Sequence, residues 1–386
     1  MKKYLVPGFL LVALLVFPLA CAKQSKPPQK VSRLFALTYN YSSGKEPSFL
    51  IAEDFDKDEN LDLVVANSAS NTFSFYKGNP DGSFNEQVVY QTGADPICVA
   101  AADFNKDGLP DLAELNYADQ DIRVFLNTGR GGFRNAGHVL KPGKIPINLT
   151  AGDFNEDGFP DLAVTLRFHK VVILFGKGNG NFSEPENIPM LGQPTALVAG
   201  DYNNDKHVDI AVALAGTGNT GVEILWGKGN GQFEPSKRFK GGGQPLSIAN
   251  IDVNGDGYLD IITSSNPLHA ITFLLNNKDG TFKTMKDFAA GDFPKFIAAG
   301  DFNGDGVPDI AVTNSTNDLL AVSLGRKDGT FTYPPIFHPT DAYPQGIVVG
   351  DFNHDGLIDI AVSCRDKGLI DIFLKKNMVN PSATAS

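Results

Sequence analysis

An aspartate-rich segment of nine residues recurs seven times along this chain at nearly constant spacing. Its fullest form is DFNGDGVPD at residues 301–309. Successive segments start 48 to 51 residues apart, at Asp54, Asp103, Asp153, Asp201, Asp252, Asp301 and Asp351. A proline stands seven residues before each start, at Pro47, Pro96, Pro146, Pro194, Pro245, Pro294 and Pro344. A period of this length, held over seven units, indicates a repeat architecture.

Each unit has the pattern of four short β-strands. An apolar stretch follows the proline (residues 296–299), and a second strand follows the aspartate segment (residues 310–313). A third strand has the pattern of residues 171–175, and a glycine-rich turn ending in phenylalanine, as at residues 178–182, begins the fourth. No segment carries a 3.6-residue apolar period long enough for a helix. The sequence therefore predicts an all-β fold, a seven-bladed β-propeller of four-stranded blades, rather than a solenoid.

The two ends of the chain supply evidence that the ring is closed. The last unit stops after residues 370–374 and lacks its fourth strand. A strand of the missing type occurs at residues 33–39, where Phe35 precedes Pro47 by 12 residues, as the turn phenylalanine does in other units. We expect this N-terminal strand to complete the last blade, which removes free sheet edges.

With these features the chain resembles the FG-GAP/VCBS repeat propellers, a family related to the propeller of integrin α-subunits. The resemblance rests on the seven Asp-Phe-Asn-x-Asp-Gly-x-x-Asp loops, the Gly-x-Phe turns and the prolines before the loops, and it covers residues 33–376. It implies a propeller with calcium-binding loops. It leaves the biological role open, because such propellers serve as adhesion modules, lectins and appendages of enzymes.

The spacing of oxygen-bearing side chains in each loop suits calcium, which takes six to eight oxygen ligands. Positions 1, 3, 5 and 9 offer side-chain oxygens, and position 7 offers a backbone carbonyl. The predicted ligands are Asp54, Asp56, Asp58, Asp62, Asp103, Asn105, Asp107, Asp111, Asp153, Asn155, Asp157, Asp161, Asp201, Asn203, Asp205, Asp209, Asp252, Asn254, Asp256, Asp260, Asp301, Asn303, Asp305, Asp309, Asp351, Asn353, Asp355 and Asp359. Up to seven Ca²⁺ are therefore expected. The alternatives are metal-free Asx-turn hairpins and, less well suited because of its tighter geometry, Mg²⁺.

Two loops depart from the pattern at position 6, where the other five carry glycine. The first has Glu59 there and the fourth has Lys206. A sharp turn at this position favours a positive φ, which strains any residue other than glycine. Lys206 also adds a positive charge beside the expected ion, so the fourth site is expected to be the weakest.

Glu114 is unusual because the other units carry valine or threonine at its position. It gives residues 103–114 the spacing of an EF-hand loop, but the flanking segments are strands, so an EF-hand is rejected. We expect Glu114 to form a salt bridge with a lysine or arginine on a neighbouring strand. The alternative is that this carboxylate marks a site.

The N-terminus has the pattern of an export signal, with two lysines followed by an apolar stretch at residues 5–19. Residues 1–21 are predicted to be a signal peptide of the lipoprotein type, with Cys21 acylated. Ordinary signal-peptidase cleavage and a retained anchor are the alternatives. Residues 22–32 read as a polar tether, and residues 377–386 as a disordered tail. The expected location is the bacterial cell envelope, with a lipid as the membrane contact.

The composition and the motifs limit what the protein can bind or catalyse. A net charge of −11 and the lack of a basic stripe argue against nucleic acid. No Ser/His/Asp order, HExxH motif or phosphate loop is present, so a non-enzymatic, monomeric binding, adhesion or scaffold module for a protein or glycan is expected. An envelope enzyme of the polysaccharide-lyase type is the alternative. Candidate ligand contacts, on the face opposite the calcium loops, are Tyr117, Arg167, His169 and Arg365.

Overall fold

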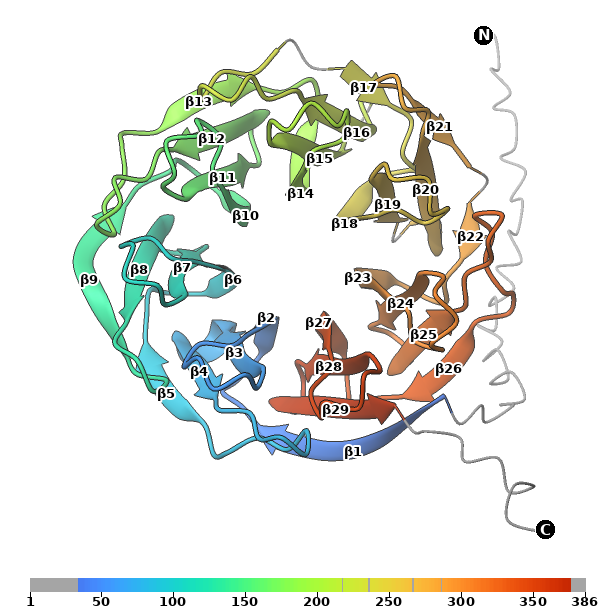
Figure 1. The fold of residues 1–386 in the computed structure, drawn as a ribbon, viewed down its shortest axis with the longest axis horizontal. Coiled ribbons are helices and arrows are strands. Elements are labelled where there is room, and N and C mark those ends of the chain that lie inside the picture. Colours follow the sequence, from blue (N-terminus) through green and yellow to red (C-terminus); the bar gives the residue numbers. More distant parts are fainter. Residues whose placement is uncertain (1–33, 217, 235–236, 266, 286, 376–386) are drawn as a thin grey trace, which may run out of the picture. The chain divides into compact units, whose positions relative to one another are not determined.

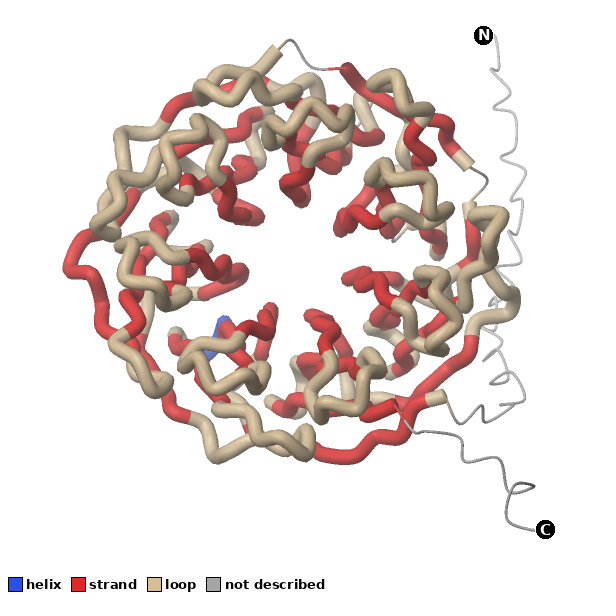
Figure 2. The backbone as a smooth tube through the Cα atoms, in the orientation of Figure 1, coloured by secondary structure: helices blue, strands red, loops and turns tan. Residues whose placement is uncertain are grey.

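The computed structural model describes residues 34–375, except 217, 235–236, 266 and 286. Several predicted features lie outside the described residues: the signal peptide (1–21), the acylated Cys21, the tether (22–32) and the tail (377–386). Among the residues described, no helix has the length and apolar character needed to cross a membrane. Strands and loops account for the described part, together with one short helical turn, η1 (Ser68–Ser70) (Figure 2).

Seven antiparallel sheets of four strands surround a common centre, which confirms the seven-bladed propeller (Figure 1). The innermost strands are β2 (Pro47–Glu53), β6 (Pro96–Ala102), β10 (Pro146–Gly152), β14 (Gln193–Gly200), β18 (Pro245–Ile251), β23 (Pro294–Gly300) and β27 (Pro344–Gly350). The second strands are β3 (Asp62–Asn67), β7 (Asp111–Asn116), β11 (Asp161–Leu166), β15 (Asp209–Ala215), β19 (Asp260–Ser265), β24 (Asp309–Asn314) and β28 (Asp359–Cys364). The third strands are β4 (Thr72–Tyr76), β8 (Asp121–Asn127), β12 (Lys170–Leu174), β16 (Gly221–Leu225), β20 (Ala270–Asn276), β25 (Leu319–Ser323) and β29 (Leu369–Lys375).

The outer strands are less regular than the inner ones. They are β5 (Val88–Gln91), β9 (Phe133–Leu140), β13 (Glu186–Pro189), β17 (Lys237–Phe239), β21 (Phe282–Thr284), β22 (Phe288–Ala289), β26 (Ile336–Pro339) and, for the last blade, β1 (Phe35–Ser42). The outer strand of the fifth blade is divided into β21 and β22, and both pair with β20. The repeated prolines begin six of the inner strands and are the second residue of β14, and the last aspartate of each loop begins the second strand.

The second strands form the driest part of each blade, because a neighbouring blade covers each of their faces. All residues of β3, β7 and β11 are buried, and the same holds for β19, β24 and β28. Strands that are covered on both sides are buried along their whole length, rather than at alternate residues. The core is therefore a series of apolar clusters between adjacent blades rather than one central mass.

Two side chains of each repeat, both aromatic except for Val253 in the fifth loop, explain how neighbouring blades adhere. Position 2 of the aspartate loop is fully buried, and it meets the phenylalanine of the next blade's Gly-x-Phe turn. The rings of Phe55 and Phe133 lie 5.5 Å apart, and those of Phe104 and Phe182 lie 5.4 Å apart, both edge to face. Such pairs add roughly 0.5–1.5 kcal/mol beyond the area they bury. Both motifs are therefore structural contacts as well as parts of the loops.

The ring closes as the sequence predicts. β1 runs antiparallel to β29, with Phe35 opposite Lys375 and Tyr41 opposite Ile370. Phe35 is 6% exposed, and its ring lies 5.7 Å from that of Phe302 in the sixth blade. The hydroxyl of Tyr41 accepts a hydrogen bond from the backbone N–H of Phe84 in the first blade, at 2.8 Å. One strand thus joins three blades.

Candidate functional site

The seven aspartate loops share one backbone conformation, which connects the innermost strand to the second strand of each blade. Position 6 has a φ between 71° and 90° in all seven loops, as the glycines there predict: Glu59 72°, Gly108 89°, Gly158 85°, Lys206 75°, Gly257 86°, Gly306 80° and Gly356 80°. Position 4 also lies in the left-handed region: Lys57 61°, Lys106 63°, Glu156 55°, Asn204 57°, Gly255 71°, Gly304 79° and His354 57°. This second turn was missed, because only two loops carry glycine at position 4.

The first aspartate of each loop holds this conformation by accepting backbone N–H groups. In the second loop, Asp103 accepts the N–H of Asp107 at 3.1 Å and the N–H of Gly108 at 2.9 Å. The bond from position 6 to position 1 occurs in every loop. The amide of Asn105 donates to Asp107 at 2.8 Å, so positions 3 and 5 are already neighbours.

The last aspartate of each loop is buried and joins three parts of its blade. Oδ2 of Asp309 accepts the N–H of Phe302 in the loop at 2.9 Å, and Oδ1 accepts the N–H of Gly325 after the third strand at 2.7 Å. Its equivalents, which make the same pair of bonds, are Asp62, Asp111, Asp161, Asp209, Asp260 and Asp359. Burial raises the pKa of each of the seven to about 6 or about 7. A nearby cation would favour the charged form of these groups.

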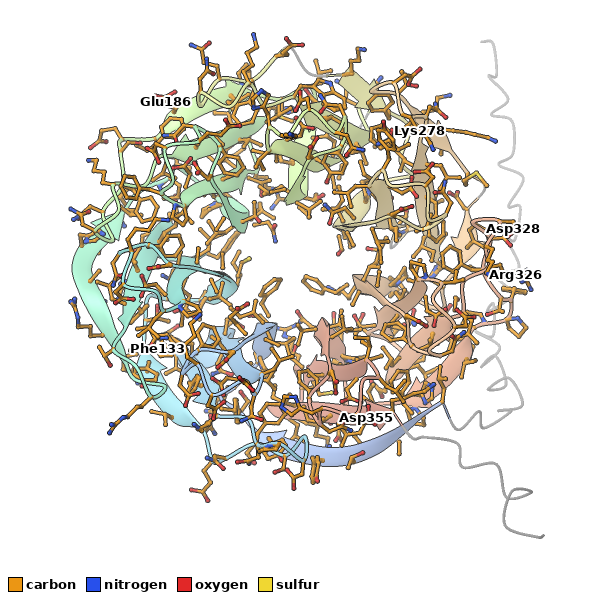
Figure 3. All side chains as sticks on the ribbon, viewed as in Figure 1. Phe133, Glu186, Lys278, Arg326, Asp328 and Asp355 are labelled. Carbon is orange, nitrogen blue, oxygen red and sulfur yellow. The ribbon has the colours of Figure 1, made fainter. Side chains whose placement is uncertain are left out.

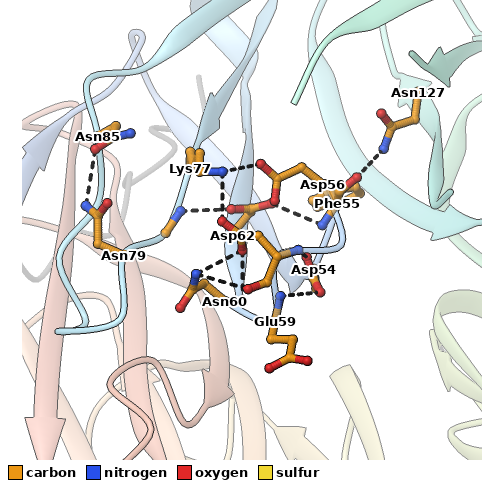
Figure 4. Close-up of polar contacts among 12 residues, drawn as sticks. Asp54, Phe55, Asp56, Glu59, Asn60, Asp62, Lys77, Asn79, Asn85 and Asn127 are labelled. Atoms are coloured by element: carbon orange, nitrogen blue, oxygen red, sulfur yellow. Dashed lines mark hydrogen bonds and ion pairs between the residues drawn. The ribbon is translucent and has the colours of Figure 1, made fainter. Parts of the chain in front are cut away.

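The oxygen atoms of the loops suit a hard cation. In the first loop, one carboxylate oxygen each from Asp54, Asp56 and Asp58 lies within 4.8 Å of the others. In the third loop, Oδ1 of Asp153 is buried and has no hydrogen-bond partner among the described residues. An orphaned carboxylate oxygen beside further carboxylates is costly unless a cation or proton neutralises it. Figure 4 shows the first loop, with Asp54, Asp56 and Asp62 close together and Lys77 against Asp56.

Neighbouring loops contact one another around this face of the ring. His207 Nδ1 lies 2.5 Å from Glu156 of the preceding blade, and His354 Nε2 lies 2.8 Å from the side-chain oxygen of Asn60 in the first blade. The ammonium of Lys106 lies 5.8 Å from the ring centre of Phe159 in the next blade. A change in the conformation of one loop can therefore alter its contacts with the adjacent blade.

The strain at position 6 gives a prediction for the fourth loop. A Cβ at Gly108 or Gly306 would meet no atom within 4 Å, so the penalty of a side chain at this position is backbone strain alone. We expect Lys206→Gly to raise the free energy of unfolding by about 1 kcal/mol, measured by urea denaturation in chelator. Lys177→Gly is the control, because Lys177 is an exposed lysine with no positive φ and its replacement should destabilise. If Lys206→Gly is less stable than the wild type, the positive φ of Lys206 does not strain the fourth loop.

Glu114 does not form the expected salt bridge. It is fully buried in β7 opposite Arg123 of β8, but Arg123 pairs with Asp119 at 3.1 Å and Asp121 at 3.8 Å instead. Neither carboxylate oxygen of Glu114 has a hydrogen-bond partner among the described residues. Burial raises the pKa of Glu114 to about 8, and the nearby Thr92 and Arg123 oppose this only in part. Asp121 begins the strand of Arg123 and Asp119 lies in the turn before it, so both carboxylates lie within reach of the guanidinium.

We expect Glu114→Val, which restores the residue type of other blades, to stabilise the protein by about 1–3 kcal/mol at pH 8. The folded-state pKa is above the unfolded value, so the wild type loses stability as pH rises from about 4.5 to about 8. The gain from valine should therefore be larger at pH 8 than at pH 5 in urea unfolding. Glu114→Gln should remove the pH dependence without the full gain. A Glu114→Val variant less stable than the wild type would show that the carboxylate has an essential partner.

The four candidate ligand contacts do not form one cluster. Tyr117 is half-buried in the second blade, Arg167 and His169 are exposed in the third, and Arg365 belongs to the seventh. Arg365 is paired with Glu46 and lies over the ring of Tyr343 at 5.6 Å. Within the described part of the chain, no hydrogen bond, ion pair or ring contact joins any of the four to another. The charge of Arg365 is thus already matched within the protein.

A central channel was not predicted from the sequence. A cavity of about 630 Å³ is lined by residues from all seven innermost strands, among them Phe49, Ile97, Ile147 and Leu246. Phe49 and Phe296 meet edge to face there, with ring centres 5.7 Å apart. The signal in the sequence was an apolar side chain one or two residues after most of the prolines. The outer rim is more polar, and Figure 3 shows Arg326 and Asp328 on the outer edge of the sixth blade.

Comparison with protein families settles the kind of repeat. A model described as an FG-GAP-like repeat matches residues 54–114, 115–164, 153–212, 201–263, 252–312 and 301–362. The chain belongs to the FG-GAP-like repeat family. Each of five matched stretches begins at the first aspartate of a loop. A search of curated proteins gives no match.

Solved structures share the propeller fold of this FG-GAP-like protein at low identity. One is BBS1N in complex with ARL6DN, at 12% identity and a TM-score of 0.64, covering 90% of this chain and 98% of that chain. Another is virginiamycin B lyase from Staphylococcus aureus, at 13% identity and a TM-score of 0.61, covering 89% and 100%. At such identities the likeness shows the fold alone. An FG-GAP-like propeller of this kind fits a binding or scaffold module.

Proposed function

We propose that this FG-GAP-like propeller is a calcium-binding, non-enzymatic module of the bacterial cell envelope that binds a protein or glycan partner. Calcium binding is supported by the repeated loop, which brings several carboxylate and amide oxygens close together and has a buried aspartate at position 9. Carboxylates in such numbers repel one another unless a cation lies between them. Calcium suits flexible loops of carboxylates, amide oxygens and backbone carbonyls.

The residues that would hold calcium are those at positions 1, 3, 5 and 9, with the backbone carbonyl at position 7. Calcium supplies charge neutralisation here and no chemistry. The aspartates at position 9 already fix each loop to its blade through backbone N–H groups. Binding of an ion at the exposed side of the loop would therefore stabilise the blade directly.

The partner part of the proposal rests on the fold and on the face opposite the calcium loops. The similar propeller of BBS1N is described in complex with another protein, ARL6DN. Tyr117 offers an aromatic ring on the second blade, and Arg167 and His169 offer an exposed guanidinium and an exposed imidazole on the third. These groups suit an acidic protein segment or a charged glycan. Export with a lipid on Cys21 would place this surface outside the cytoplasm.

The alternative is an envelope enzyme of the polysaccharide-lyase type. Such an enzyme needs a base and a charge neutraliser at one bond of the substrate. Tyr117, Arg167 and His169 make no contact with one another among the described residues, which favours the binding module.

The experiment combines a binding and a turnover assay on the exported protein. The double variant Tyr117→Ala/Arg167→Ala should lose at least about 10-fold in affinity for partners captured from bacterial envelope. Arg134→Ala, an exposed arginine on the outer strand β9, is the matched control and should bind normally. Turnover of acidic polysaccharide by the wild type, lost in the double variant, would contradict the proposal and support the lyase. Mass spectrometry of the mature N-terminus should show a lipid on Cys21; a mature chain that carries an unmodified Cys21 would contradict the lipid anchor.

A further inference from the structure

Lys77 occupies a position that is apolar in every other blade. Tyr76, the last residue of β4, pairs with Leu63, and Lys77 follows it. The residues that follow the equivalent pairs in the other blades are Leu126, Phe175, Trp226, Leu275, Leu324 and Leu374. Several of these pack against glycines of the next blade's turn, as Leu126 does against Gly180. In the first blade the ring of Phe75 makes the corresponding contact with Gly131 of the next blade's turn, so the side chain at position 77 does not supply it.

The ammonium of Lys77 lies among the carboxylates that were predicted to bind calcium. Its Nζ atom forms an ion pair with Asp56, and it lies 2.7 Å from Oδ2 of Asp58 (Figure 4). The side chain of Asp56 is 5% exposed, so this carboxylate is shielded from solvent, whereas the Lys77 side chain is 37% exposed. Because an ammonium at hydrogen-bond distance from two ligands fills the space between them, a second cation cannot share it.

The first loop differs from the others at the matching position. Position 3 is Asp56 there, whereas the other six loops carry asparagine. The extra negative charge and the extra positive charge therefore occur in the same blade. An asparagine amide can turn its oxygen toward an ion, but an ammonium has three donors and no acceptor. The loops with asparagine can switch to an ion-bound state that the first loop cannot reach while Lys77 is present.

Other cations near the loops do not share this placement. Lys278 lies 3.4 Å from Asp256 in the fifth loop, but its side chain is 48% exposed and projects from a turn. Within the described loop its only ion pair is the one with Asp256. Lys278 can leave the loop without breaking a buried contact, whereas Lys77 cannot.

We propose that Lys77 is a built-in counter-ion that takes the place of calcium in the first loop, so that the ring binds at most six calcium ions. This inference rests on the proposed calcium function of the other loops. It changes the role of Asp54, Asp56, Asp58 and Asp62 from metal ligands to a lysine-neutralised turn. The first blade, which carries the contacts with the closing strand, then keeps its structure when calcium is scarce.

The test is calcium stoichiometry by equilibrium dialysis and elemental analysis. The wild type is expected to bind six ions and Lys77→Leu, with the side chain of the other blades, seven. Lys57→Gln, which removes an exposed lysine of the same loop, is the control and should leave six. Seven ions on the wild type, or no gain in Lys77→Leu, would overturn the inference.

A stability measurement separates this inference from the calcium function itself. In chelator, Lys77→Leu leaves the carboxylates of the first loop without a counter-ion, so its Tm should fall by at least about 2 °C relative to the wild type. If neither protein binds calcium, the proposed function fails, and this Tm alone decides the role of Lys77. If Lys77→Leu has the same Tm as the wild type in chelator, Lys77 is not the counter-ion of the first loop.

Discussion

A chain that lacks residues 34–42 is expected to lose at least about 5 kcal/mol of its free energy of unfolding, and to aggregate. These residues include the whole of β1, which supplies the outer strand of the last blade. Their loss exposes the edge of β29 and removes the contacts of Phe35 with Phe302 and of Tyr41 with Phe84. The measurement is urea denaturation followed by near-ultraviolet circular dichroism, with size-exclusion chromatography to detect aggregates.

A matched pair of substitutions in β1 tests the same contacts in the intact chain. Phe35→Ala should cost about 3–5 kcal/mol, because the ring is 6% exposed and packs between blades. Leu37→Ala should change stability by less than about 0.5 kcal/mol, because Leu37 is 46% exposed in the same strand. Equal effects of the two substitutions would show that β1 does not close the ring through Phe35.

Replacing the buried aspartate of a loop should be nearly as damaging. Asp309→Ala leaves the N–H groups of Phe302 and Gly325 without acceptors, at a cost of about 1–3 kcal/mol each. The variant should therefore lose about 2–6 kcal/mol in urea denaturation, even in chelator. The loss does not depend on a metal, because both hydrogen bonds form without one.

The exposed Asp305 of the same loop is the control for a purely ion-binding role. Asp305→Ala removes the acceptor of the Val307 N–H and of the exposed Asn303 amide, and it should cost less than about 1 kcal/mol in chelator. In calcium its cost should increase, because a ligand is lost. If Asp309→Ala is as mild as Asp305→Ala in chelator, position 9 has no structural role of its own.

The architecture could be predicted because each repeat carries several independent sequence signals for the same local structure. Three signals fix the backbone conformation: the proline at the inner strand, the glycine at position 6 and the Gly-x-Phe turn. Because they recur at the same spacing in the repeats, the agreement is not a coincidence. The closing strand could be predicted as well, since Phe35 keeps the spacing of the other turn phenylalanines. The structure places each of these as expected.

The features that were missed depend on the backbone conformation of the loop and on side-chain contacts within one blade, which the repeat pattern does not specify. The second left-handed turn has no single residue type, since Lys57, Glu156 and His354 all adopt it. The placement of Lys77 in the first loop requires the register of β3 and β4, which spacing alone does not supply. Glu114 was expected to form a salt bridge with a residue of a neighbouring strand, but Arg123, which lies opposite it, forms ion pairs with Asp119 and Asp121. Which carboxylate pairs with an arginine depends on the distances in the folded structure, and the sequence pattern does not give these distances.

The most direct test of the calcium loops is thermal unfolding of the purified protein in millimolar calcium and in EDTA, with metal content measured on the same sample. Ions that bind only the folded ring stabilise it by about 2.7 kcal/mol per site at a concentration 100 times the dissociation constant. Several such sites should raise Tm in calcium by at least about 10 °C over EDTA. An identical Tm in both buffers, with no calcium in the protein, would contradict calcium binding by these loops.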